Sequence, residues 1–256
     1  MIKTRSTFSF LNHESFMAFA HRGANELSPE NTLESFSLAY TLGFKNFELD
    51  VHASADGEVF VCHDDNLERL VGERLHLSRL TCKEINALDR THGYKIPSLF
   101  SILEEFPYAR LNIDAKSWKV VNPLCKVIKA SQSHDRICIG SFSDLRTYSI
   151  VQKLGSSVCH SLGPLGVLHC YLGFHLKKTC KFRAGCLQIP ETYYGLNFVS
   201  NKFIEFAHKS GLLVHIWTIN DESRMRQLIE LGVDGIMTDN CSGLKKVLQE
   251  YELWNY

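Results

Sequence analysis

Glu48 and Asp50 alternate with apolar residues in the strand-like run 47–51. Alternate side chains of a strand share one face, so these two carboxylates project together, and by the same parity Asp114 projects with Lys116. Unpaired carboxylates on one buried face are costly, and a hard divalent cation would remove that cost. Because the set offers oxygen donors and no cysteine, it predicts one divalent cation, Mg²⁺ or Ca²⁺ rather than zinc, held by Glu48, Asp50 and Asp114.

Ionisable residues close four consecutive strand-like runs. They are His21-Arg22, the Glu48 and Asp50 pair, His63-Asp64, and the Asp114 and Lys116 pair. Taken singly, each has a structural explanation, because charged residues in strands are commonly exposed or salt-bridged and a lone strand-end histidine is commonly structural. Their coincidence at successive strand ends favours a catalytic rim, where Lys116 could bind an anionic substrate.

A glycine that ends a helix and is followed at once by an apolar strand recurs at Gly43, Gly155, Gly211 and Gly232. Glycine takes the left-handed position that returns a helix to a sheet, so this repeat predicts helices alternating with parallel strands. Eight strands are predicted, at 16–20, 47–51, 111–115, 136–140, 157–160, 186–189, 213–218 and 235–239. This number of strand–helix units, with no glycine-rich phosphate loop after the first strand, favours a (β/α)₈ TIM barrel over an open sheet.

The pair Asp56-Gly57, flanked by strand formers, predicts a small β-hairpin after the second strand. No proline- or glycine-rich linker divides the chain, so we expect one α/β barrel domain over 16–251, with tails at 1–15 and 252–256. The active site of such a barrel lies at the C-terminal ends of its strands, which is where the ionisable residues stand.

The composition disfavours several classes of protein. Of the 256 residues, 28 are basic and 28 acidic, so no global field attracts nucleic acid. Nine cysteines, an odd number without CxxC spacing, indicate reduced thiols and a cytoplasmic protein. The first residues, which include Lys3 and Arg5, lead into no signal-peptide run, and no apolar run approaches the ~20 residues of a membrane span.

An ordered set of motifs resembles the glycerophosphodiester phosphodiesterase family over nearly the whole chain. The motifs are His21-Arg22-Gly23, Ser28-Pro29-Glu30-Asn31-Thr32, 47–51, Asp56-Gly57, His63-Asp64, 96–99, 112–116, Ser141-Phe142, 217–220 and 232–239. Two departures qualify the resemblance. The family usually has Glu where this chain has Asp114, one methylene shorter, and it tends to place Pro two residues after the pair Thr238-Asp239, where this chain has Cys241.

The resemblance implies metal-dependent hydrolysis of glycerophosphodiesters, such as glycerophosphocholine or glycerophosphoethanolamine, to glycerol 3-phosphate and an alcohol. The implied acid–base pair is His21 and His63: one would deprotonate the attacking oxygen and the other would protonate the leaving alkoxide. The other implied site residues are the metal ligands Glu48, Asp50 and Asp114, the phosphate-binding Arg22 and Lys116, the apolar wall Trp217, and the bordering Glu30, Asn31 and Phe142. Asn31 has a structural alternative, as the cap of the first helix in a capping box with Glu34.

Three other functions use the same residues. A lysophospholipase D-type enzyme would act on a substrate that still carries an acyl chain. Attack by a neighbouring hydroxyl would give a cyclic phosphate in place of direct hydrolysis. A non-catalytic phosphate-binding barrel is disfavoured, because both histidines are present.

The family motifs leave the segment 162–183 unexplained. Apolar residues crowd 162–176, and they are followed by the basic residues Lys177, Lys178, Lys181 and Arg183. An ordinary barrel helix with a solvated end accounts for this pattern. The alternative is weak contact with a membrane surface, with the segment guiding a lipid tail towards the site.

Overall fold

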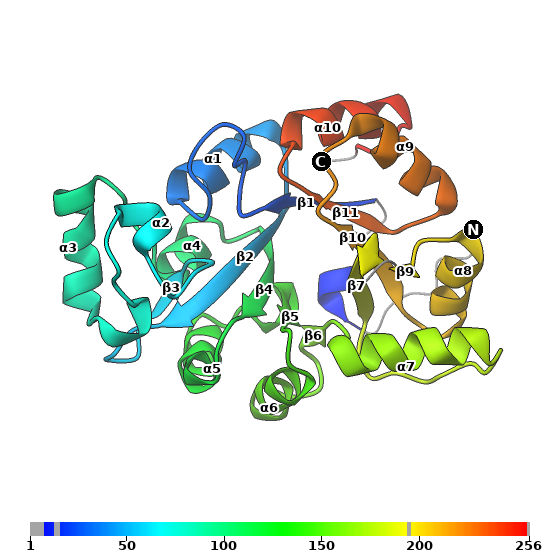
Figure 1. Ribbon diagram of the computed structural model, residues 1–256, viewed down its shortest axis with the longest axis horizontal. Coiled ribbons are helices and arrows are strands. Elements are labelled where there is room, and N and C mark those ends of the chain that lie inside the picture. The colour runs from blue at the N-terminus through cyan, green and yellow to red at the C-terminus, as the bar shows by residue number, and fades with distance from the viewer. Residues whose placement is uncertain (1–7, 13–15, 194–195, 255–256) are drawn as a thin grey trace.

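The computed structural model of the chain describes residues 8–12, 16–193 and 196–254, and these form a parallel barrel surrounded by helices (Figure 1). Its strands are β1 (Met17–His21), β2 (Asn46–Ala53), β4 (Arg110–Ala115), β5 (Ile137–Gly140), β6 (Cys159–His160), β7 (Cys186–Pro190), β10 (Leu213–Trp217) and β11 (Gly235–Thr238). They pair side by side in the order β6-β5-β4-β2-β1-β11-β10-β7. The predicted TIM barrel is confirmed.

The barrel closes between β6 and β7 through sparse contacts. An isolated parallel bridge joins Ser161 to Cys186. The Leu162 N–H donates to the Cys186 carbonyl over 3.0 Å, and the Gly185 N–H donates to the His160 carbonyl over 3.0 Å. The eight strands therefore form a nearly closed ring whose weakest seam lies between β6 and β7.

The helices that cover the barrel follow the strands in the predicted alternation. They are α1 (Leu33–Leu42), α4 (Leu99–Glu105), α5 (Val121–Ala130), α6 (Asp144–Leu154), α7 (Pro164–His175), α8 (Asn201–Lys209), α9 (Glu222–Leu231) and α10 (Cys241–Glu250), with the 3₁₀ turns η3 (Trp118–Val120) and η4 (His134–Arg136). Gly43 and Gly232 end α1 and α9 in the predicted left-handed conformation. Gly155 differs, because its φ of 102° is combined with an extended ψ of 160°.

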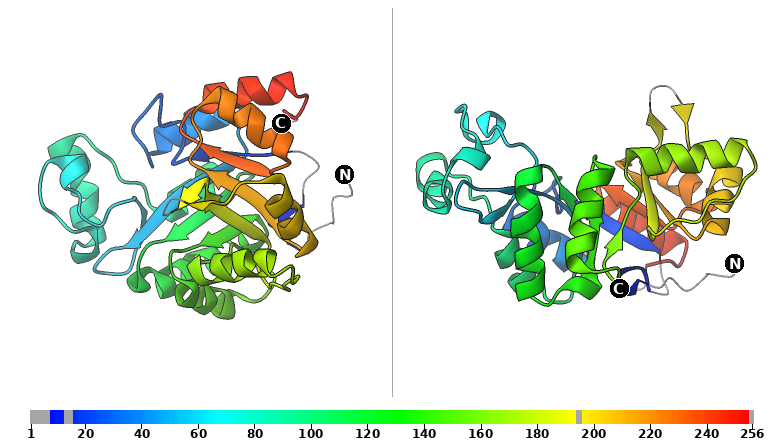
Figure 2. Two further views of the ribbon diagram at one scale, coloured as in Figure 1. Left: turned by 45° about the vertical axis from the view of Figure 1, so that its right-hand side comes forward. Right: turned by 90° about the horizontal axis from the view of Figure 1, so that it is seen from below.

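The predicted hairpin forms where β3 (Val59–Val61) pairs antiparallel with β2. Beyond it, α2 (Glu68–Val71), η2 (Leu77–Arg79) and α3 (Cys82–His92) build a small lobe that projects from the side of the barrel (Figure 2). The lobe has its own apolar cluster around Phe60, Leu67 and Leu77. A second hairpin, β8 (Thr192–Tyr193) with β9 (Leu196–Asn197), follows β7. The first hairpin carries His63 back to the mouth of the barrel.

The N-terminal end of the barrel is plugged by the short 3₁₀ turn η1 (Ser9–Leu11). Phe10 and Leu11 are buried, and the Phe10 ring stacks on Phe19 of β1 with centroids 6.4 Å apart. Gly185 permits this close approach, because a Cβ there would lie 2.6 Å from the Leu11 side chain. The expected boundaries at 16 and 251 stay a prediction, although the described part of the expected N-terminal tail packs against the barrel.

An ion pair between α8 and the start of β11 predicts a pH dependence of stability. His208 Nε2 lies 2.7 Å from Asp234 Oδ2, and this hydrogen bond raises the pKa of His208. A histidine whose pKa is raised by folding stabilises the folded state. This stabilisation is fully present below the pKa of the unfolded chain, about 6.5, and is lost as the pH rises through the pKa of the folded state. We therefore expect His208→Gln to lower the free energy of unfolding by up to about 1 kcal/mol at pH 6. The loss should be smaller at pH 9, measured by urea unfolding, with His134→Gln as the control; equal losses at both pH values would contradict the assignment.

Candidate active site

A cavity of about 550 Å³ opens at the C-terminal ends of the strands and brings together most of the predicted site residues. Its lining includes His21, Arg22, Glu48, Asp50, His63, Asp114, Lys116, Phe142 and Trp217. Glu30 lies in an adjoining pocket, which His21 and Arg22 also line. Asn31 is buried beside the acidic cluster, where its side-chain amide donates to Asp50. The residues that the strand-end rule selected therefore lie together at one cavity.

Three buried carboxylates share the floor of the cavity, as the strand parity predicted. Glu48, Asp50 and Asp114 are each less than a tenth exposed. Lys116 Nζ lies 2.7 Å from Asp50 Oδ1 and 2.8 Å from Asp114 Oδ2, and Arg22 Nε lies 3.2 Å from Asp50 Oδ2. Asp50 thus contacts two cationic side chains, and Asp114 shares one of them.

The environment separates the pKa values of the two β2 carboxylates. Burial and the neighbouring Asp50 raise the pKa of Glu48 to about 8. Burial would also raise the pKa of Asp50, but Lys116 and Arg22 outweigh it and hold that pKa below its usual value. The protein's own cations therefore compensate Asp50 and leave Glu48 poorly compensated.

The unpartnered atoms of this cluster fit a hard divalent cation. Within this cluster, three buried oxygens of described residues have no hydrogen-bond partner: Glu48 Oε2, Asp114 Oδ1 and Asn31 Oδ1. Buried polar atoms are rarely left unpaired in folded proteins. Carboxylate and amide oxygens are the ligands that Mg²⁺ and Ca²⁺ prefer. The shorter Asp114 still presents one free oxygen, so its departure from the family pattern does not remove it from the donor set.

His21 is held by a carboxylate that the sequence analysis did not assign to the site. Its Nδ1 lies 2.6 Å from Asp239 Oδ1, and its Nε2 lies 3.7 Å from Glu48 Oε2. Burial would lower the pKa of His21, but Glu48 and Asp239 outweigh it and raise that pKa. Asn25 and Asn220 donate to the two oxygens of Asp239. Although burial opposes it, hydrogen bonding lowers the pKa of Asp239 to about 2.

His63, which also lines the cavity, has a similar arrangement. Its Nδ1 lies 2.7 Å from Asp64 Oδ1, while Arg69 Nε donates to Asp64 Oδ2 over 2.8 Å. His52 Nε2 contacts the His63 backbone carbonyl at 3.2 Å. Each imidazole thus has an aspartate on Nδ1, which leaves Nε2 as the nitrogen available to a substrate.

The loop after β1 places Arg22 and Asn31 in left-handed backbone conformations, with φ values of 61° and 57°. Such values are uncommon outside glycine. The Asn31 N–H donates to the Arg22 carbonyl over 2.8 Å, and the Arg22 guanidinium lies 3.2 Å from Glu30. The loop therefore fixes three predicted site residues in one hydrogen-bonded unit.

The capping alternative for Asn31 is wrong. Thr32 caps α1 and forms the capping box with Ser35, not with Glu34. A cap residue needs an extended backbone, which Thr32 has with φ −105° and ψ 155°. The left-handed backbone of Asn31 directs its amide inward, where Nδ2 donates to Asp50 Oδ2 over 3.2 Å.

The opposite side of the cavity is apolar. Trp217 at the end of β10 packs edge-to-face against Phe142, with ring centroids 6.0 Å apart. The wall continues along the start of α7 and the segments beside it, with Leu162, Leu165, Val167, Leu168, Tyr171, Pro190 and Phe198. The cavity therefore joins a charged floor to an apolar side large enough for more than a glycerol group.

The contact between His21 and Asp239 predicts a positioning role for the aspartate. Asp239→Asn should lower kcat by roughly 10²-fold while changing KM little, because the imidazole loses the group that fixes its orientation and tautomer. Nitrogen NMR of the His21 ring should show loss of the single Nδ1–H tautomer. The control is Asp135→Asn on η4. An unchanged tautomer in Asp239→Asn would contradict the positioning role.

Comparison with known proteins identifies the family of the chain and agrees with its fold. The model of the glycerophosphoryl diester phosphodiesterase family matches residues 21–162 and 174–242. The chain is 31% identical to Probable glycerophosphodiester phosphodiesterase 2 of Mycobacterium tuberculosis, an alignment that covers 97% of each chain. It is 25% identical to Lysophospholipase D GDPD1 of Rattus norvegicus, over 90% of this chain and 85% of the relative.

A solved structure has the same architecture. It is a phosphodiesterase from Oleispira antarctica in complex with the product sn-glycerol-3-phosphate. The two superpose with a TM-score of 0.77 at 24% identity, covering 95% of this chain and 99% of the other. The likeness therefore extends over the whole barrel.

Proposed function

The chain belongs to the glycerophosphoryl diester phosphodiesterase family and is a phosphoric diester hydrolase, and on that premise we propose that it cleaves glycerophosphocholine, glycerophosphoethanolamine and related diesters to glycerol 3-phosphate and an alcohol. The observation that carries the proposal is one cavity in which three buried carboxylates lie with two aspartate-backed histidines. The glycerol 3-phosphate bound by the similar Oleispira enzyme supports the product class.

The proposed ligands of one divalent cation are Glu48, Asp50 and Asp114, and the family generally depends on such an ion. When bound, Mg²⁺ or Ca²⁺ would neutralise phosphate charge and orient an oxygen nucleophile. The unpartnered oxygens of Glu48 and Asp114 support this assignment.

His21 and His63 divide the proton transfers between them. One Nε2 takes the proton of the attacking water, and the other gives a proton to the alkoxide that leaves. Asp239 and Asp64 hold the Nδ1 side of the two rings, so each ring keeps one orientation through the reaction. Water attack breaks the bond between phosphorus and the alcohol oxygen, and glycerol 3-phosphate remains.

Arg22 and Lys116 are the proposed phosphate-binding cations. Both line the cavity and both contact Asp50, so they are placed at the junction of the acidic floor and the substrate space. Trp217 and Phe142 form an apolar wall on one side of that space. Glu30 restrains the Arg22 guanidinium through an ion pair in which Oε1 lies 3.2 Å from the guanidinium nitrogen.

A lysophospholipid is the second proposed substrate, because the cavity wall continues onto an exposed apolar face. Leu165, Leu168, Leu172 and Leu176 are 50–72% exposed. Their spacing of three or four residues places the first three on one face of α7, and Leu176 follows at its C-terminal cap. Leu165 and Leu168 also line the cavity. An acyl chain could therefore pass from the cavity along α7. The rat relative's name, Lysophospholipase D GDPD1, supports this substrate class.

The two substrates are separated by comparing kcat/KM for glycerophosphocholine and for lysophosphatidylcholine below its micelle concentration. A Leu165→Ser, Leu168→Ser double variant should lower kcat/KM for the acylated substrate only. Equal losses for both substrates would contradict an acyl path along α7.

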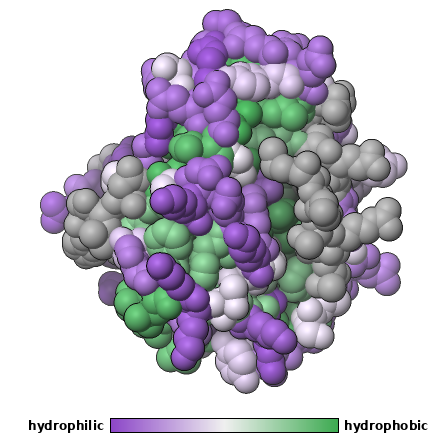
Figure 3. All heavy atoms as spheres, turned by 90° about the vertical axis from the view of Figure 1, so that its right-hand side faces the viewer, coloured by the Kyte–Doolittle hydropathy of each residue, from purple (hydrophilic) through white to green (hydrophobic). Residues whose placement is uncertain are grey.

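We also propose that segment 162–183 makes weak contact with an anionic membrane surface. The apolar face of α7 leads directly into four exposed cations, Lys177, Lys178, Lys181 and Arg183. Figure 3 shows hydrophobic and hydrophilic side chains next to one another on the face of the molecule that lies on the right in Figure 1. Within the described ranges, no helix is long and apolar enough to cross a bilayer. Free thiols at all nine cysteines support the proposal of a cytoplasmic protein.

Charge reversal tests the membrane contact. The triple variant Lys177→Glu, Lys178→Glu, Lys181→Glu should bind phosphatidylserine-containing liposomes roughly tenfold or more weakly, because each basic residue near an anionic surface contributes about 1 kcal/mol. Turnover of soluble glycerophosphocholine should not change. The matched control reverses Lys126, Lys129 and Lys153, which are exposed on α5 and α6. Liposome binding that is unchanged in the first variant would remove the proposal.

A further inference from the structure

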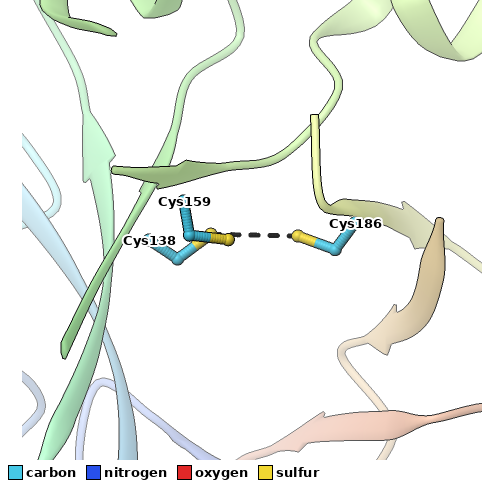
Figure 4. A group of neighbouring side chains, drawn as sticks. All are labelled: Cys138, Cys159 and Cys186. Atoms are coloured by element: carbon cyan, nitrogen blue, oxygen red, sulfur yellow. Dashed lines mark hydrogen bonds between the residues drawn. The ribbon is translucent and has the colours of Figure 1, made fainter. Parts of the chain in front are cut away.

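Three cysteines converge inside the barrel, on the side of the catalytic floor that faces the N-terminal plug. Cys138, Cys159 and Cys186 come from β5, β6 and β7, and each is at most 1% exposed (Figure 4). Their sulfur atoms all lie within 4.8 Å of one another, and the Cys138 and Cys186 sulfurs are 3.8 Å apart. The pairing of Cys138 with Cys159 follows from the register of β5 and β6.

A buried histidine contacts one of the three thiols. His215 of β10 is fully buried, its Nδ1 contacts Gln188 Nε2 at 3.3 Å, and its ring also interacts with the Cys186 thiol. Within the described residues, His215 Nε2 has no hydrogen-bond partner. A buried nitrogen without a partner costs about 1–3 kcal/mol, so its presence calls for an explanation.

The surroundings of the three thiols and of the His215 ring are apolar. Phe8, Phe10, Leu11 and Phe19 pack with the three cysteines in one apolar cluster. The Phe19 ring lies 5.1 Å from the His215 ring. Cysteine can serve as a small apolar core residue, but that role does not account for a buried imidazole that contacts a thiol while its Nε2 has no hydrogen-bond partner.

The sulfur spacing agrees with a tetrahedral metal ion. Zinc–thiolate bonds of about 2.3 Å at tetrahedral angles place two sulfurs roughly 3.8 Å apart. Three cysteines and one histidine are a standard ligand set of structural zinc. The catalytic carboxylates, by contrast, offer only hard oxygen donors, so the two sites select different ions.

We propose that Cys138, Cys159 and Cys186 bind a thiophilic ion of the Zn²⁺ class, with His215, which contacts the Cys186 thiol, as the candidate fourth ligand. On binding, sulfur–metal bonds replace the S–H bonds and the thiol protons are released to solvent. The ligands lie on both sides of the sparse seam between β6 and β7, so the ion would tie the two ends of the sheet together. Because η1 seals this end of the barrel, the ion enters during folding.

Cobalt provides the test, because only thiolate ligands give intense sulfur-to-cobalt charge-transfer absorption. The reduced full-length protein is unfolded in guanidinium and refolded with Co²⁺, and the excess ion is removed by dialysis. We expect retained Co²⁺ with a charge-transfer band that is lost in Cys186→Ala and kept in the control Cys125→Ala, a buried cysteine of α5. Catalytic carboxylates cannot produce this band, so the result is independent of the proposed activity.

Three results would overturn the proposal. The first is no charge-transfer band in refolded wild-type protein, a result that does not depend on any variant folding. The second is a band that persists in Cys186→Ala. The third is a disulfide between Cys138 and Cys159 in protein isolated with its thiols trapped, detected by mass spectrometry.

Discussion

Glu48→Gln is expected to abolish both tight divalent-cation binding and turnover, with kcat/KM falling by roughly 10³-fold or more. The physical reason is that, of the three floor carboxylates, only Glu48 has no described Lys or Arg side chain within 4 Å. Its Oε2 is buried, has no hydrogen-bond partner and lies 3.7 Å from His21 Nε2, so a bound ion is what would use it. Cation affinity is measured by isothermal titration of metal-stripped protein.

The control for this prediction is Glu34→Gln, an exposed carboxylate on α1. Asp114→Asn should weaken cation affinity as well, because it neutralises the second carboxylate with an unpartnered oxygen. Wild-type affinity in both Glu48→Gln and Asp114→Asn would show that the ion is held elsewhere.

His21→Ala and His63→Ala are each expected to lower kcat by roughly 10²–10⁴ while the divalent cation still binds. Each ring is held on Nδ1 by its own aspartate and presents Nε2 to the cavity, so neither replaces the other. The measurement is kcat with glycerophosphocholine, together with cation titration of each variant. His134→Gln serves as the control. A variant that kept its kcat within threefold of wild type would remove that histidine from the acid–base pair.

The grouping of the charged side chains on the cavity floor could be predicted from the sequence, because it depends on residues that are close together within single strands. Side-chain alternation along β2 and β4 puts Glu48 with Asp50, and Asp114 with Lys116, on the same face. The barrel rule then places strand ends at the active site. Both steps use residues within one strand, and the structure brings all four side chains to the same cavity.

The aspartate that holds His21 could not be predicted in the same way. Asp239 follows the last strand, and it reaches His21 only because β11 pairs with β1 in the ring. The signal was present, since Asp239 also stands at a strand end, but its partner is fixed by barrel closure. The loop residue Asn31 was harder, because its left-handed backbone is set by hydrogen bonds to Arg22 and Asp50.

The thiol cluster shows the same limit. The sequence indicated buried, reduced cysteines, and the structure has them as free thiols. Their convergence depends on the registers of β5, β6 and β7, and on the inward direction of His215 from a fourth strand. Strand-like runs in the sequence carry no information about which runs become neighbours across the seam.

Metal-stripped protein incubated with glycerophosphocholine, with and without added Mg²⁺ or Ca²⁺, tests the central claim most directly. The site predicts no release without an added ion, and equal amounts of free choline and glycerol 3-phosphate when the ion is restored. Unchanged turnover in the metal-stripped protein would contradict a metal-dependent phosphodiesterase at this cavity. So would a lack of turnover of both glycerophosphocholine and lysophosphatidylcholine after either ion is added.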